Sequence, residues 1–326
     1  MIQEIKIKNI KFSKHQMVNQ PAISVKNLNK IYGKNSLSEK VALDNINLDI
    51  PKGSIFGLLG PNGAGKSTFI NILADLVKKT SGKVNVLGVD HEKDLKTVKS
   101  SMGIVPQELN IDPFFTPYEL LEIQAGLYGV SRKNRKTNQI LEMLALSEKS
   151  QAYARTLSGG MRRRLLIAKA MVHDPEILIL DEPTAGVDVE LRSNLWDSIH
   201  LLNNKGKTII LTTHYLHEAE ELCDTIAIID KGKLVACDTK ENIKSFINNK
   251  KITINYKPKD NFDISELKKM DLNIEYNANC IVINYIPNEI DFDKILQKIQ
   301  ETGIEVIDMN IKESNLEDVF LKLTKN

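Results

Sequence analysis

The stretch Leu58–Thr68, LLGPNGAGKST, decides the fold, because its glycines and charges stand between an apolar run and a helix-like segment. Within it, Gly60–Ser67 fits the pattern G-x-x-x-x-G-K-[ST] after an expected strand and at the start of an expected helix. Glycines let backbone N–H groups turn inward on an anion, and the start of a helix adds partial positive charge. The stretch therefore predicts a loop that binds phosphate.

Each polar residue of this loop has an expected task. Lys66 would reach the β- and γ-phosphates of a nucleotide, Ser67 would bind Mg²⁺, and Thr68 would donate to a nearer phosphate. The expected nucleotide-binding residues of the loop are Gly60, Pro61, Asn62, Gly63, Ala64, Gly65, Lys66, Ser67 and Thr68.

A second apolar run, Ile177–Leu180, ends in two adjacent carboxylates, Asp181 and Glu182. Buried carboxylates need partners, and magnesium is one. We expect Asp181 to hold the metal, usually through water. Glu182 would polarise the attacking water as a general base, a role worth about 10²–10⁴ in rate.

Two further polar residues follow apolar runs directly. Gln107 comes after Gly103–Val105, and His214 comes after Thr208–Thr212. Taken alone, each would more often be an ordinary loop residue. Ligands of open α/β sheets bind outside the carboxyl ends of the strands, so we expect both residues at the same edge as the phosphate loop.

A third glycine-containing segment, Leu157–Gly160, opens the helix-like run that continues to Val172. Small residues at the start of a helix form an anion site, so Ser158 and Gly160 are expected to contact phosphate. The alternative is that Ser158 is only a helix cap, since serine is a common residue at that position. The neighbouring Arg162–Arg164 span most of a helical turn, and we expect them on a solvated or intersubunit face.

Strand-like runs alternate with helix-like runs up to Thr239, which predicts an α/β fold with a parallel sheet covered on both faces. The expected strands are Ile23–Leu28, Ile46–Ile50, Ile55–Leu59, Val84–Leu87, Gly103–Val105, Ile177–Leu180, Thr208–Thr212 and Thr225–Ile229. The expected helices are Lys66–Val77, Pro117–Leu127, Arg132–Leu144, Gly159–Val172, Glu190–Asn203 and Tyr215–Leu222.

The composition changes after Thr239 to a segment rich in lysine and asparagine, which predicts a domain boundary near Lys240. The tail, residues 241–326, has its own strand and helix patterns and is expected to form a small α+β domain. Residues 1–21 are an N-terminal extension ahead of the main domain, residues 22–240. Met17 is a plausible alternative start, and we assign residues 1–16 no function.

Composition excludes several classes of protein. The 326 residues carry a formal net charge of +2, so no strong field would attract nucleic acid, and no nucleic-acid partner is expected. The three cysteines have no metal-ligand spacing and are expected to be reduced thiols in the cytoplasm. The longest apolar runs fall far below the roughly 18 residues that span a bilayer, so we expect no membrane span.

The order of these motifs along the chain resembles an ATP-binding cassette. The motifs are the phosphate loop, the glutamine loop around Gln107, the Leu157–Gly160 signature, the ILILDE strand, the TAGVD loop and the switch histidine His214. The match covers about residues 22–240. The resemblance implies a P-loop NTPase fold with a RecA-like core, an antiparallel β subdomain and a helical subdomain. It implies ATP and Mg²⁺ as cofactors and ATP hydrolysis as the activity.

The resemblance also assigns roles. Two cassettes pair head to tail in that family, so Ser158 and Gly160 of one copy would face the γ-phosphate held by Lys66 of a second copy. Gln107 would touch Mg²⁺ with Ser67, and His214 would hold the γ-phosphate. The catalytic residues are then Glu182, His214 and Gln107, and the metal ligands are Ser67, Gln107 and Asp181. Tyr32 would stack on adenine. Asp188 would lie at the dimer seam.

The segment Val105–Val130 and the closing SNLEDVFLKLT resemble the ATPase subunits of ABC-2-type exporters more narrowly. This implies a separate membrane permease as partner, contacted through Asp112–Glu119, and a peripheral position on the inner face of the cell membrane. The bland expectation for the aromatic residues Phe114, Phe115 and Tyr118 is that at least one packs inside the helical subdomain. Two alternatives remain, an importer ATPase and a soluble cassette ATPase of translation or DNA repair.

Overall fold

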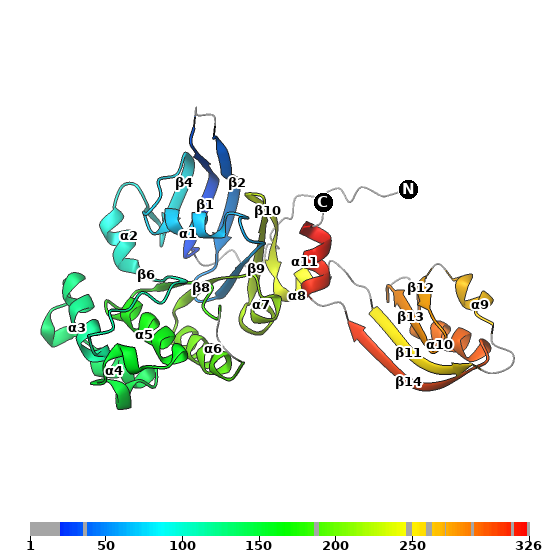
Figure 1. The fold of residues 1–326 in the computed structure, drawn as a ribbon. Coiled ribbons are helices and arrows are strands. Elements are labelled where there is room, and N and C mark those ends of the chain that lie inside the picture. The colour runs from blue at the N-terminus through cyan, green and yellow to red at the C-terminus, as the bar shows by residue number, and fades with distance from the viewer. Residues whose placement is uncertain are drawn as a thin grey trace. The chain divides into compact units, whose positions relative to one another are not determined.

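The computed structural model describes residues 20–34, 38–185, 189–245, 250–258, 263–270, 272–287, 290–313 and 316–324, and Figure 1 shows the elements. The chain divides into two compact units between Lys240 and Glu241, which we describe separately. Almost all of the N-terminal extension, and the residues Gly186–Asp188 of the TAGVD loop, lie outside the described residues.

The first unit is built on a six-stranded sheet in the order β10-β9-β3-β8-β7-β6. Strands β3, β6, β7, β8 and β9 run parallel and β10 pairs antiparallel with β9. The bounds are β3 Ile55–Leu59, β6 Met102–Val105, β7 Ile177–Asp181, β8 Thr208–Thr213, β9 Thr225–Asp230 and β10 Lys233–Thr239. Strand β10 was not among the expected strands.

A second sheet of four antiparallel strands belongs to the same unit, in the order β2-β1-β4-β5. The bounds are β1 Ile23–Tyr32, β2 Lys40–Ile50, β4 Ser81–Val86 and β5 Val89–Asp90. The expected strands Ile23–Leu28, Ile46–Ile50 and Val84–Leu87 therefore do not join the parallel sheet, whereas the antiparallel subdomain implied by the family resemblance is present. Antiparallel pairing of β1 with β2 across a short connection explains the difference, because only parallel strands need a helical crossover.

Helix α1, Lys66–Leu73, lies between the two sheets, and one apolar core joins them. Phe69 and Ile72 of α1 are buried in a cluster that includes Ile23 and Leu48 of the antiparallel sheet and Ile179 of β7. Figure 1 shows α1 on one side of the six-stranded sheet and helices α5, α6 and α7 on the other. Their bounds are α5 Gly159–Met171, α6 Val189–Asn204 and α7 Leu216–Leu222.

A helical subdomain is inserted between β6 and β7. It comprises α3 Pro117–Leu127, α4 Thr137–Met143 and the first turns of α5, with short 3₁₀ turns at Arg132–Asn134, Ser147–Lys149 and Ala154–Thr156. Helix α4 begins five residues later than expected, because Arg135 is extended and its side chain binds Glu122 of α3 at 2.6 Å. Helix α2, Leu95–Ser101, which precedes β6, was not expected.

An exposed ionic joint connects the helical subdomain to the core. Asp174, just after α5, contacts Lys136 at 2.9 Å and Lys207 at 2.6 Å. Hydrogen bonds from these two lysines lower the pKa of the Asp174 carboxyl to about 2.

The second unit has a β-α-β-β-α-β order with a four-stranded antiparallel sheet, β12-β13-β11-β14, which is the ferredoxin-like arrangement. Alternate residues of β11 and β13, such as Ile254 and Ile283, pack against Ile295 and Ile299 of α10. The bounds are β11 Lys250–Pro258, α9 Ser265–Lys268, β12 Asn273–Tyr276, β13 Cys280–Tyr285, α10 Phe292–Glu301 and β14 Ile304–Glu313, with α8 Lys240–Ser245 before and α11 Leu316–Thr324 after them.

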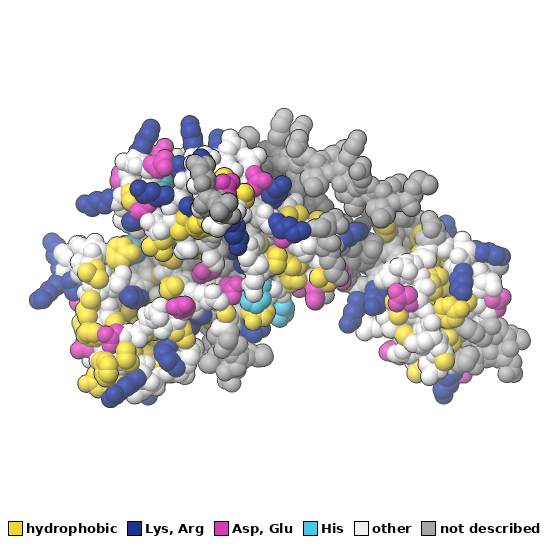
Figure 2. Space-filling model, turned by 45° about the horizontal axis from the view of Figure 1, so that its top comes forward, with side chains coloured by type: hydrophobic (Ala, Val, Ile, Leu, Met, Phe, Trp, Pro, Cys, Tyr) yellow, Lys and Arg dark blue, Asp and Glu magenta, His cyan; other side chains and the backbone are white. Residues whose placement is uncertain are grey.

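The visible surface carries its charges in mixture. Figure 2 shows Lys and Arg side chains scattered among acidic ones and no continuous basic field on that face. Within the described ranges, every helix is too short or too polar to span a bilayer.

Candidate active site

The phosphate-type loop lies between β3 and α1, as the sequence predicts, and its backbone is tightly enclosed. A side chain at Gly60 would place its Cβ 2.2 Å from the carbonyl oxygen of Ile229. Gly65 has φ +115° and a Cβ there would lie 2.6 Å from the Ala42 carbonyl oxygen. Glycine is therefore required at both positions, for close approach at Gly60 and for approach and backbone conformation at Gly65.

Lys66 begins α1 with its side chain buried at 5% exposure. Its Nζ donates to the carbonyl oxygens of Gly60 at 2.7 Å and Pro61 at 3.1 Å. Burial lowers the pKa of the Lys66 ammonium, and the nearby carboxylates of Glu182 and Asp181 oppose that shift. The ammonium is thus held above the loop and close to both acidic residues.

Glu182 lies between the two other polar residues that were expected at this edge. The Gln107 Nε2 donates to Glu182 Oε2 at 3.0 Å. On the other side, the His214 Nδ1 lies 3.2 Å from Glu182 Oε1, within ion-pair distance although the contact lacks hydrogen-bond geometry. Glu182 has φ +46°, a left-handed conformation that costs free energy for a residue with a side chain and is common at functional sites.

Thr212 of β8 is hydrogen bonded to both Asp181 and Glu182, and it was not among the expected site residues. The backbone N–H of Glu182 donates to Thr212 Oγ1 at 3.0 Å, and Thr212 Oγ1 donates to Asp181 Oδ1 at 2.5 Å. The parallel register pairs Asp181 with Thr212, so a hydroxyl beside the carboxylate follows from the sheet order. The sequence signal for this residue was the pair Thr212 and Thr213 before His214. The contact itself could be predicted only from the order of the strands in the sheet.

One cavity of about 490 Å³ joins the loop to this edge. The expected residues that line it are Tyr32, Asn62, Gly63, Gly65, Lys66, Ser67, Thr68, Gln107, Glu182 and His214. Lys40 and Ala42 of β2 also line it and were not anticipated. Residues that follow β3, β6, β7 and β8 therefore meet in one place, as expected for the carboxyl ends of neighbouring parallel strands.

Four expected residues of the loop and the acidic pair do not line the cavity. Gly60 and Pro61 contact Lys66 through their carbonyl oxygens, Ala64 is buried in the core, and Asp181 is reached through Thr212. These residues therefore stabilise the loop and the acidic pair without lining the cavity.

Tyr32 lines the same cavity from the end of β1, opposite Lys40 in the register of β1 and β2. Its ring is 38% exposed, and the Lys30 Nζ lies 4.5 Å from the ring centre. An aromatic face at the rim suits stacking on a base. Stacking on adenine stays a prediction.

Ser158 and Gly160 lie outside this cavity, at the start of α5 in the helical subdomain. The Ser158 Oγ accepts from the backbone N–H of Met161 at 3.2 Å, so the serine does cap the helix. Within its own chain this helix end has no contact with the phosphate-type loop among the described contacts, and its role toward a nucleotide remains a prediction.

The expectation that Arg162–Arg164 lie on a solvated face is wrong for Arg163, which is 2% exposed. Its guanidinium points into the protein and donates to carbonyl oxygens of the loops after β6 and β7. Helical periodicity alone could not show this, because the surface of α5 is covered by the glutamine loop.

The donors around the cavity fit magnesium. Ser67, Gln107 and Asp181 offer hydroxyl, amide and carboxylate oxygens, the hard ligands that Mg²⁺ prefers. In the described part of the chain, no cluster of three or more His, Cys, Asp or Glu forms a metal cage. Magnesium usually binds through one or two protein ligands together with substrate phosphates, so this sparse set is the expected one.

Comparison with known proteins identifies the family. The family model described as ABC transporter matches residues 43–185. The linearmycin resistance ATP-binding protein LnrL of Bacillus subtilis is 34% identical over 93% of this chain and 98% of its own length. The daunorubicin resistance ATP-binding protein DrrA3 of Streptomyces coeruleorubidus is 31% identical over 93% of this chain and 96% of its own length.

A solved structure supports the same assignment. The dimeric structure of an ATP-binding cassette in a post-hydrolysis state, bound to ADP and Pi, aligns with a TM-score of 0.58 and 28% identity over 67% of this chain and 98% of that one. The phosphate-type loop, the acidic strand end and the two subdomains therefore have one explanation. The chain belongs to the ABC transporter family of ATPases, as an ATP-binding subunit.

Proposed function

We propose that this chain is the motor subunit of an exporter. It binds and hydrolyses ATP at a head-to-tail interface between two copies and drives a substrate through a separate ABC-2-type permease. The observation that carries the proposal is the Glu182 carboxylate, held between Gln107 and His214 at the rim of the cavity that Lys66 and Ser67 line.

The proposed chemistry divides among these side chains. Lys66 binds the β- and γ-phosphates, Ser67 and Gln107 with Asp181 hold Mg²⁺, and His214 contacts the γ-phosphate. Bound Mg²⁺ would neutralise charge on the phosphates. Glu182 accepts the proton of the attacking water, and its position between two polar partners fixes the carboxylate for that step.

The proposed dimer is supported by a helix end that lies outside the cavity of its own chain. Ser158 and Gly160 form a second anion-binding helix end outside the cavity of their own chain. The solved cassette with ADP and Pi is dimeric by its description. A second copy would bring this helix end onto the nucleotide.

The exporter assignment rests on the relatives. LnrL and DrrA3 are ATP-binding proteins of linearmycin and daunorubicin resistance, and both align over nearly the whole chain, tail included. We infer that this chain serves export as well, with its cargo chosen by the permease.

A surface for the permease lies beside the glutamine loop. Phe114 is 68% exposed and Phe115 is 37% exposed, while Tyr118 is half-buried. Of the three aromatic residues, at least one of which was expected to pack inside the helical subdomain, Tyr118 is the most enclosed. Figure 2 shows hydrophobic side chains gathered on the surface around α3 and α4, at the left of the view.

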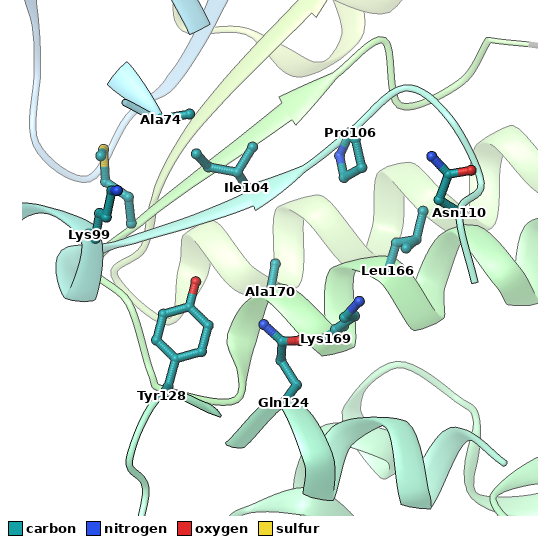
Figure 3. Close-up of a pocket in the computed structure, with 11 residues that line it drawn as sticks. Ala74, Lys99, Ile104, Pro106, Asn110, Gln124, Tyr128, Leu166, Lys169 and Ala170 are labelled. Atoms are coloured by element: carbon teal, nitrogen blue, oxygen red, sulfur yellow. The ribbon is translucent and has the colours of Figure 1, made fainter. Parts of the chain in front are cut away.

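A groove of about 520 Å³ lies between the core and the helical subdomain. Figure 3 shows Ile104 and Pro106 from β6 and its loop, Gln124 and Tyr128 from the α3 side, and Leu166 from α5 bordering it. We propose that a short permease helix occupies this groove, with ATP-driven closure relayed through the adjacent Gln107.

The structure determines which variant should test this surface. Glu119 and Thr116 form a capping box at the start of α3, so a Glu119→Arg change would disturb the helix as well as the surface. Phe114 is better suited, because most of its side chain is exposed. Leu201 on α6 is a control, because it is apolar and 38% exposed and lies outside the Asp112–Glu119 stretch; neither Phe114 nor Leu201 lines the groove.

The test is co-expression with the permease encoded by the neighbouring gene. We expect the chain alone in the cytosolic fraction and the chain with its permease in the membrane fraction. Phe114→Asp should reduce membrane recovery while ATP binding is kept, and Leu201→Asp should change neither. Purification with ribosomes or DNA, and no recruitment by a verified permease, would favour the soluble alternative.

A further inference from the structure

The middle arginine of the Arg162–Arg164 run is buried under the active site. Arg163 lies in the second turn of α5, four residues after the start of that helix, and only 2% of its surface is exposed. Burial lowers the pKa of its guanidinium, and the carboxylates of Glu218 and Asp181 oppose that shift. A buried cation of this kind is costly unless its N–H groups are satisfied. In the described part of the chain, both Nη groups of Arg163 have hydrogen-bond partners and its Nε has none.

The partners of Arg163 are backbone carbonyls of two loops. Its Nη1 donates to the carbonyl oxygens of Pro106 and Gln107, both at 2.9 Å. Its Nη2 reaches the carbonyl oxygen of Glu182 at 3.5 Å, a long contact. One planar guanidinium therefore joins the loop after β6 to the loop after β7.

These two loops carry the side chains that must meet. Gln107 and Glu182 are hydrogen bonded to each other at 3.0 Å, and Glu182 has the strained φ of +46°. Loops on their own vary in position, whereas a fixed fork of donors sets the separation of the carbonyls that it binds. The first turn of the same helix carries Ser158 and Gly160.

We propose that Arg163 is a positioning residue for ATP hydrolysis. It holds the backbones of Gln107 and Glu182 at a fixed separation and ties both to the helix that begins at Ser158. The inference rests on the proposed function, because it assigns Arg163 a task only if Glu182 and Gln107 serve hydrolysis.

The next residue provides a matched control. Arg164 Nη1 also donates to two carbonyl oxygens, those of Leu144 at 2.9 Å and Ala145 at 3.3 Å. Those carbonyls lie at the end of α4 in the helical subdomain, away from the cavity. Arg163 and Arg164 thus make the same kind of contact in different places.

The experiment compares Arg163→Lys with Arg164→Lys in the full chain. Lysine keeps the charge, but a single ammonium cannot bridge the two loops as the fork does. We expect Arg163→Lys to lower kcat on the order of 10- to 100-fold with KM for ATP nearly unchanged, because misplacement of a catalytic group affects the chemical step. Arg164→Lys should leave kcat and KM close to wild type.

A second readout separates positioning from folding. Binding of a fluorescent ATP analogue in the presence of Mg²⁺ should be as strong in Arg163→Lys as in wild type, because the proposed loss lies in the chemical step and not in the binding of nucleotide. In a Gln107→Ala background the effect of Arg163→Lys on kcat should shrink, since the separation that Arg163 sets between Gln107 and Glu182 matters less once the Gln107 side chain is gone. Equal losses in both backgrounds would contradict the proposal.

The outcomes are distinguishable. If Arg163→Lys and Arg164→Lys behave alike, Arg163 has no positioning role. If Arg163→Lys does not fold by circular dichroism, Arg163→Gln replaces it, and failure of both to fold would overturn the proposal in favour of a purely structural role. Absence of ATP hydrolysis in the wild-type chain would instead refute the proposed function.

Discussion

The starts of α1 and α5 look alike in sequence but differ in their surroundings. Both helices have glycine at their start: Gly65 precedes Lys66, the first residue of α1, and Ser158 precedes Gly159 and Gly160, the first two residues of α5. The α1 end faces a cavity lined by its own chain. The α5 end lies outside that cavity, and its first turn is capped by its own serine.

The difference is that the α1 end lines a cavity together with other residues of its own chain, whereas the described residues form no such cavity at the α5 end. At α1, Gly65 adopts φ +115°, and a Cβ there would lie too close to the Ala42 carbonyl oxygen. The backbone at this helix end is therefore fixed by its own chain. At α5, a Cβ on Gly159 would meet no atom within 4 Å, so this face is open. An open anion-binding end fits contact with the nucleotide of a second copy, as proposed above.

The largest expected effect separates binding from hydrolysis at the α1 end. Glu182→Gln should lower turnover by about 10²–10⁴, because it removes the general base. ATP binding should persist, since Lys66 and the loop are untouched. Size-exclusion chromatography with ATP should then show a stable dimer, closed by the α5 ends. Rapid hydrolysis by Glu182→Gln would remove Glu182 from the mechanism.

An intermediate effect tests whether the two ends meet in trans. Lys66→Ala should lose ATP affinity, because hydrogen bonds to charged groups contribute about 1.5–3 kcal/mol each. Ser158→Arg should block the α5 end by size and charge while its own chain still binds ATP. We expect neither variant alone to hydrolyse ATP.

Mixing the two inactive variants gives the decisive measurement. A mixed dimer pairs the intact Lys66 of one chain with the intact Ser158 of the other, so the mixture should regain part of the ATPase rate. Mixing Lys66→Ala with Glu182→Gln is the control and should regain none, because both changes damage the α1 side. Equal rates in the two mixtures would break the comparison.

The smallest expected effect concerns the tail. Both helix ends precede Lys240, where the chain divides into its two units. A chain ending at Lys244 should therefore bind ATP as the full chain does, with isothermal titration as the measurement and circular dichroism as the check of folding. Loss of binding by a folded truncation would show that the proposed domains, residues 22–240 and 241–326, are not independent. We propose dimer support or regulation as the role of the tail.

The sequence predicted the elements whose signals are local. Strand β3 and helix α3 have the expected bounds, the latter because Thr116 and Glu119 form a capping box before a run without glycine breaks until its end. Helix α1 ends four residues earlier than expected, since Asp75 adopts φ +57°. Strand β10 was missed because its pattern, KLVACDT, has no clear alternation.

The site was predictable to the extent that each side chain directly follows a strand. Gln107, Glu182 and His214 were placed at one edge by that rule and Lys66 by the motif of the loop after β3, and all four line the cavity. Contacts from a neighbouring strand or from the middle of a helix were not predictable. Thr212 and Arg163 act through the sheet register and through packing of α5 under two loops, and neither is encoded in spacing along the chain.

The joint at Asp174 has a mechanical consequence. Its ion pair with Lys136 of the helical subdomain is exposed on both sides, and such pairs contribute roughly 0–1 kcal/mol and are screened by salt. Lys207, on the core side, is mostly buried. Arg163, by contrast, connects the same helix to the core inside the protein. Rotation of the helical subdomain would therefore cost little free energy at the C-terminal end of α5, beside Asp174, and much more near Arg163. The region around Arg163 is then the expected hinge of such a rotation.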